Sequence, residues 1–67
     1  MLTIEIERED DGRWLGEVPA LPGVMAYGSS EAEARAKVSA LALRVIADRI
    51  EHGEPVPVEA SGLFAAA

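Results

Sequence analysis

The sequence predicts an α+β domain in which one long helix packs on a small sheet. Two segments before residue 18 alternate apolar and polar residues, a proline- and glycine-rich run follows, and a later stretch repeats apolar residues every three or four positions. With 67 residues and no cysteine, the chain is expected to form one domain without disulfides. We expect the order strand, strand, strand, helix, strand over residues 1–58, and a C-terminal tail over residues 59–67.

The first two strands are predicted to form a β-hairpin. In residues 2–7 and 14–18 most apolar residues occupy even-numbered positions, which is typical of strands with one buried face. The polar run E-D-D-G at residues 9–12 separates the two segments. Both apolar sets, including Trp14, are therefore placed on the buried face of the hairpin.

The length of the hairpin loop sets the register, and two lengths keep both apolar sets on one face. A three-residue loop places Glu5 opposite Glu17, whereas a five-residue loop, residues 8–12, places Ile6 opposite Trp14. Like charges directly opposite each other are destabilising. We therefore predict the five-residue loop.

The run V-P-A-L-P-G at residues 18–23 is predicted to end the second strand. A proline lacks the backbone N–H that a central strand needs. Gly23 can adopt the positive φ of a tight reversal, and Leu21 supplies one buried anchor. A third strand is expected over residues 24–27, closed by Gly28.

One amphipathic helix of about 20 residues is expected to begin at Glu31. Ser30 and Glu33 form a capping box, in which the hydroxyl accepts from the Glu33 amide and the carboxylate accepts from the Ser30 amide. Gly53 offers the left-handed conformation that commonly ends helices. The apolar face expected to lie on the sheet comprises Ala34, Val38, Leu41, Ala42, Val45, Ile46 and Ile50. Residues 54–58 contain two prolines and are read as a short fourth strand at the sheet edge.

The composition fits a basic partner better than a nucleic acid, and the alternative is that the negative charge simply keeps a small protein soluble. Twelve acidic and six basic residues give a formal charge of -6, which repels a phosphate backbone, so no direct nucleic-acid binding is expected. No signal peptide pattern opens the chain, and no apolar stretch approaches the roughly 20 residues of a membrane span, so we expect a soluble, cytoplasmic protein. Because so small a domain has a marginal core, we also expect a homo-oligomer, either a dimer or a tetramer.

Two segments resemble the HicB family of antitoxins. Residues 12–23 read G-R-W-L-G-E-V-P-A-L-P-G, and residues 28–34 read G-S-S-E-A-E-A. They are similar to the glycine-containing acidic turn, the aromatic residue, the V-P-x-L-P-G element and the G-x-[ST]-x-x-E-A helix start of that family. The match covers residues 1–58, and Ala20 stands where the family usually carries an acidic residue.

The resemblance implies a β-β-β-α-β domain with a partial ribonuclease H-like fold, in which the last strand lies parallel to the first and the sheet is mixed. It also implies an antitoxin-like protein that neutralises a HicA-type toxin, a small basic protein that cleaves messenger RNA, by occluding it. No DNA-binding domain follows the match here, so we expect the short, stand-alone form. The alternative is an orphan HicB-like regulatory or small-ligand-binding module without a toxin partner.

The predicted site is a partner-binding surface. Leu15 is an apolar residue on the otherwise polar, odd-numbered side of the hairpin, and either Met25 or Tyr27 is expected to extend it toward the third strand. Together with Glu17, these are the predicted partner-binding residues: Leu15, Glu17, Met25 and Tyr27.

We predict no catalytic, cofactor-binding or metal site, and hence no enzyme. Alternation alone places Glu5, Glu7 and Glu17 on the solvated face, so they are not assigned to Mg²⁺. The only histidine, His52, falls in the last helical turn, where a cation interacts favourably with the helix dipole. One histidine without cysteine supports neither a zinc site nor a Cys/His nucleophile.

Overall fold

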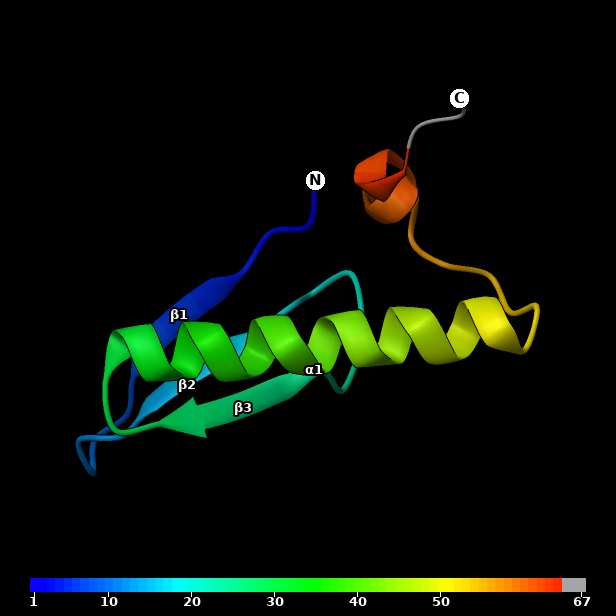
Figure 1. The fold of residues 1–67 in the computed structure, drawn as a ribbon. Coiled ribbons are helices and arrows are strands. Elements are labelled where there is room, and N and C mark those ends of the chain that lie inside the picture. Colours follow the sequence, from blue (N-terminus) through cyan, green and yellow to red (C-terminus); the bar gives the residue numbers. More distant parts are fainter. Residues whose placement is uncertain (65–67) are drawn as a thin grey trace.

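The computed structural model describes residues 1–64 as a three-stranded antiparallel sheet with one long helix across it (Figure 1). The strands are β1 (Glu5–Arg8), β2 (Trp14–Glu17) and β3 (Met25–Gly28), in the order β1-β2-β3. The long helix is α1 (Glu31–Glu51), and a short 3-10 helix, η1 (Val58–Leu63), follows it. The predicted α+β class is confirmed.

The predicted fourth strand, and with it the mixed sheet, is wrong. Residues 54–57 join no ladder, and within residues 1–64 both strand pairs are antiparallel. Two prolines deprive this segment of N–H donors. Val56, just before η1, packs against the core and Ala60 on η1 is buried, so this segment covers the core without joining the sheet. The C-terminal segment thereby returns beside the N-terminus of the chain (Figure 1).

The predicted five-residue hairpin loop is also wrong. Glu5 lies opposite Glu17 and Ile6 lies opposite Gly16, which is the register of the three-residue loop. The assignment of both apolar sets to one face is unaffected, because the two registers differ by two residues. Trp14 lies on that face and is partly buried.

The turn chemistry explains this register. Gly12 has a φ of 89° and donates its N–H to the Glu9 carbonyl at 3.0 Å, while Glu9 donates to the Arg13 carbonyl at 2.7 Å. This is the three-residue hairpin in which a left-handed glycine follows a type I turn. Asp11 accepts from the backbone N–H of Arg13 at 3.0 Å, and this bond holds the pKa of the Asp11 carboxyl below its ordinary value. These hydrogen bonds outweigh one like-charge pair on a solvated face.

The proline run forms the predicted rigid reversal between β2 and β3. Val18 donates to the Val24 carbonyl at 3.1 Å, and Leu21 donates to the Val18 carbonyl at 2.9 Å. Leu21 is fully buried, and Gly23 has a φ of 88°. The reversal therefore anchors the core and delivers β3 to the edge of β2.

The helix begins at the predicted cap. Ser30 Oγ accepts from the Glu33 amide at 3.1 Å, while Glu33 Oε1 accepts from the amide of Ser29 at 2.9 Å, one residue before the predicted donor. Lys37 Nζ lies 3.4 Å from the same carboxylate oxygen. These two contacts hold the pKa of the Glu33 carboxyl below its ordinary value, and the hydrogen bond from the Ser29 amide is the larger cause, ahead of Lys37.

The helix ends at the predicted glycine. Gly53 has a φ of 68° and donates to the Ile50 carbonyl at 3.2 Å, while Glu54 donates to the Arg49 carbonyl at 2.8 Å. Together these bonds form a Schellman motif. No helix within residues 1–64 combines the length and the apolar character needed to cross a membrane.

The core lies between α1 and the even-numbered face of the sheet. A Cβ at Gly16 would lie 3.0 Å from the Ala34 carbonyl oxygen and from Val38 Cγ1, and a Cβ at Gly28 would overlap the backbone of Ala34. The two glycines therefore allow α1 to approach the sheet closely. Ile50, predicted on the buried stripe, is 53% exposed because it lies on the other side of α1. The buried apolar cluster comprises Val18, Leu21, Val24, Val38, Ala42, Ile46 and Ala60.

Gly28→Ala is expected to destabilise the fold by about 1–3 kcal/mol, because the new methyl group overlaps backbone atoms that have no rotamer to change. Gly62→Ala is the matched control, since a Cβ there meets nothing within 4 Å. Urea unfolding monitored by circular dichroism measures both. Equal midpoints for the two variants would contradict the close approach of α1.

Glu33 predicts a pH dependence. Its folded pKa is lowered, so its stabilising contribution is present above the ordinary value of 4.5 and is lost as the pH falls through the folded pKa. Glu33→Gln should therefore melt at a lower temperature than the parent at neutral pH, with a difference that shrinks below about pH 4.5. Glu31→Gln, in the same turn, is the control. A difference that stays constant down to about pH 3 would count against the cap.

Candidate protein-interaction face

The odd-numbered side of the sheet faces away from α1, and we call it the open face. Alternation turns successive side chains to opposite sides, so the face packed against α1 leaves the other free. Within residues 1–64 neither α1 nor η1 covers it. Its side chains form two rows across the strands: Glu5, Glu17 and Met25 in one, and Glu7, Leu15 and Tyr27 in the other.

The four predicted partner-binding residues lie together on the open face. Leu15 is directly opposite Tyr27, and Glu17 is directly opposite Met25. Leu15 and Glu17 are partly buried, whereas Met25 is 46% and Tyr27 42% exposed. Both candidates for extending the apolar patch therefore extend it. Their proximity is a finding, and their role in binding stays a prediction.

Carboxylates on β1 and at the end of β2 adjoin the apolar patch. Glu5, Glu7 and Glu17 lie around Leu15 and, with Ile6, line a small hollow of about 80 Å³. The open face is thus acidic over β1 and apolar over β3. Such a surface can attract a cationic group to one side and bury apolar side chains on the other.

Arg13, the residue directly before β2, places its side chain beside Tyr27 on the open face. The sequence analysis did not predict this contact. Its guanidinium carbon lies 4.1 Å from the centroid of the Tyr27 ring, within cation–π distance. Its Nε also lies 2.7 Å from Asp11 Oδ2, so its charge is paired and the face keeps its acidic character. This contact follows from the register of β2 with β3, in which Leu15 lies opposite Tyr27, and the sequence set no register for that pair of strands.

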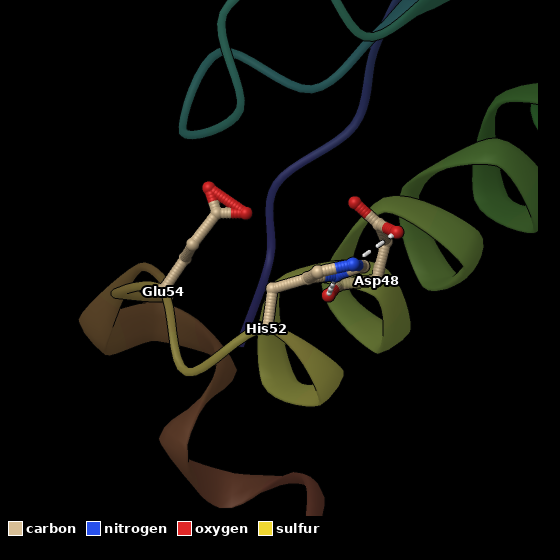
Figure 2. A group of neighbouring side chains, drawn as sticks. All are labelled: Asp48, His52 and Glu54. Carbon is tan, nitrogen blue, oxygen red and sulfur yellow. Dashed lines mark hydrogen bonds and ion pairs between the residues drawn. The ribbon is translucent and has the colours of Figure 1, made fainter.

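A cluster of three polar side chains lies at the C-terminal end of α1, away from the open face, and is shown in Figure 2. Asp48, His52 and Glu54 are all exposed and have one potential ligand atom each within 4.8 Å of the others. His52 Nδ1 lies 2.7 Å from the Asp48 carbonyl oxygen and 3.3 Å from Asp48 Oδ1. The imidazole therefore caps the last helical turn, where the sequence placed it. Helix capping accounts for the arrangement without an ion.

Comparison of the chain with protein-family models, with curated proteins and with solved structures finds no match. The case for function therefore depends on the chemistry of the open face and on the sequence resemblance.

The stacking of Arg13 on Tyr27 is expected to contribute about 0.5–1 kcal/mol, as for other exposed cation–π pairs. A double-mutant cycle with Arg13→Ala and Tyr27→Ala, measured by urea unfolding, isolates this coupling. Arg35→Ala combined with Tyr27→Ala is the control cycle and should show none. Equal coupling in both cycles would mean that the contact does not form in solution.

Proposed function

We propose that the chain is an antitoxin-like binding protein that neutralises a basic, messenger-RNA-cleaving toxin of the HicA type by occluding it in the cytoplasm. The observation that carries the proposal is the open face, where three carboxylates adjoin an exposed apolar patch. The resemblance of residues 12–23 and 28–34 to HicB antitoxins supplies the class of partner.

The charge of the chain supports a basic partner. A formal charge of -6 raises the rate of encounter with a cationic protein, and the acidic side of the open face orients that encounter. A protein that cleaves RNA must hold the phosphate backbone with cationic side chains. Glu5, Glu7 and Glu17 can pair with those cations, so bound RNA and bound antitoxin would exclude each other.

The apolar side of the open face supports a lasting complex. Met25 and Tyr27 are large and exposed, and Leu15 lies between Tyr27 and Glu7. Burial of such residues at the centre of an interface supplies most of the binding free energy, while surrounding charges fix orientation. In this mechanism the chain acts by binding alone and performs no catalytic step.

The test is co-expression with the product of the adjacent reading frame, followed by co-purification and a growth-rescue assay. Leu15→Glu should weaken binding at least tenfold, because it replaces the apolar centre of the open face by a carboxylate beside the three already there. A tenfold loss corresponds to about 1.4 kcal/mol of binding free energy. Val58→Glu is the matched control, since Val58 is 79% exposed and lies on η1, outside the open face.

Two results would contradict the proposal. One is a parent chain that binds no neighbouring basic protein and fails to rescue growth. The other is a complex that Leu15→Glu and Val58→Glu weaken equally. A small molecule retained by the purified chain, with no protein partner, would favour the regulatory or ligand-binding alternative.

A further inference from the structure

The side of α1 that faces away from the sheet carries a second apolar stripe. Ala34, Val38, Ala42 and Ile46 are buried against the sheet, and at 100° per residue the second stripe lies half a turn away from them. All its members are exposed, with Leu43 55% and Ile50 53% accessible. We call it the outer stripe, and its members are Ala36, Ala40, Leu43, Ala47 and Ile50.

The spacing of the outer stripe is that of paired helices. Its members are separated by four, three, four and three residues, which is the heptad repeat of helices that pack side by side. A helix that covers a sheet needs only one apolar stripe, and polar residues normally occupy its other side. The high helix propensity of alanine accounts for the three alanines of the outer stripe. It does not account for its two large apolar residues, Leu43 and Ile50.

We propose that a second copy of this chain packs antiparallel on the outer stripe, giving a two-fold symmetric dimer. One antiparallel register places Ala40 opposite Ile50 of the second copy and Leu43 opposite Ala47 of the second copy. Symmetry repeats both layers, so each layer joins one large side chain to one methyl group. A parallel pair would stack Leu43 on itself and leave gaps at the alanine layers, which close packing disfavours.

The charges beside the outer stripe fit the same register. Lys37, Arg44 and Glu51 follow one another at seven-residue intervals along one flank. Antiparallel packing brings Lys37 beside Glu51 of the second copy, and symmetry makes this contact twice. At the two-fold axis Arg44 lies beside Arg44 of the second copy, which is one like-charge contact. Asp48, one helical turn from Arg44 on the same chain, offsets the repulsion between the two arginines. Opposite-charge contacts therefore outnumber the like-charge contact.

A groove on the same flank gives the second helix room to approach. It has a volume of about 530 Å³ and runs along α1, with Ala26 of β3 in its wall. Alanine side chains form much of its wall, so a neighbouring helix can come close to the backbone of α1. Its lining residues are Ala26, Ala36, Lys37, Ala40, Leu41 and Arg44.

The dimer would place the two helices at its centre and the two sheets outside. Each open face then points away from the two-fold axis and stays accessible, so one dimer presents two partner-binding faces. The inference does not depend on the identity of that partner. A dimer that binds no toxin would contradict the proposed function alone, and a monomer that binds one would contradict the dimer alone.

Sedimentation equilibrium of the full chain over a range of concentrations tests the proposal. The parent should be a dimer, and Leu43→Glu should raise the dimer dissociation constant at least tenfold because it places two carboxylates in the apolar layers. Met25→Glu, at a similarly exposed apolar position on the open face (46% against 55% for Leu43), is the matched control and should leave the dimer unchanged. A parent that is monomeric up to its solubility limit, or a dimer that Leu43→Glu leaves intact, would overturn the proposal.

Cysteine cross-linking tests the orientation even if Leu43→Glu fails to fold, because the parent contains no cysteine. A mixture of Ala40→Cys and Ile50→Cys chains should form a disulfide-linked heterodimer under mild oxidation. Ala40→Cys alone should not cross-link. Self-cross-linking of Ala40→Cys, or no heterodimer in the mixture, would exclude the antiparallel register.

Discussion

The close contact of α1 with the sheet at Gly16 and Gly28 determines what the rest of the molecule can do. Because neither residue has a Cβ, the backbone of Ala34 and the side chain of Val38 lie directly against the even-numbered face. That contact covers the even-numbered face of the sheet, most closely over β2 and β3, and leaves the open face uncovered within residues 1–64. It also fixes the rotation of α1 about its axis, so that the outer stripe points to solvent.

The two free surfaces differ in chemistry and lie on opposite sides of the two layers. The open face combines carboxylates with exposed aromatic and aliphatic groups, which suits a basic protein partner. The outer stripe consists of small and aliphatic groups at heptad spacing, which suits another helix. A domain with so small a core gains stability when its outer stripe is covered, and covering it leaves the open face available.

Local signals in the sequence predicted local structure well. The bond from the Glu33 amide to the Ser30 hydroxyl, the Leu21 anchor and the Gly53 helix end occur as expected, whereas the Glu33 carboxylate accepts from Ser29 and not from Ser30. The hairpin register was misjudged because a weak charge rule was preferred to the strong conformational preference of Gly12. The prediction of a fourth strand was wrong because Val56 and Ala60 pack directly on the core instead. That packing depends on tertiary contacts, which no local sequence pattern reveals. The open face was predicted in part, since Leu15 could be chosen by parity alone, whereas the approach of Arg13 to Tyr27 depends on the register of β2 with β3, for which the sequence offers no local signal.

The central claim is that binding takes place on the face of the sheet that α1 leaves free. Titration of the isotope-labelled chain with the product of the adjacent reading frame, followed by nuclear magnetic resonance, tests it residue by residue. The account predicts that the largest shifts fall on Leu15, Met25 and Tyr27, while Ala34 and Val38 between the layers change little. Shifts confined to Leu43 and the rest of the outer stripe would contradict it.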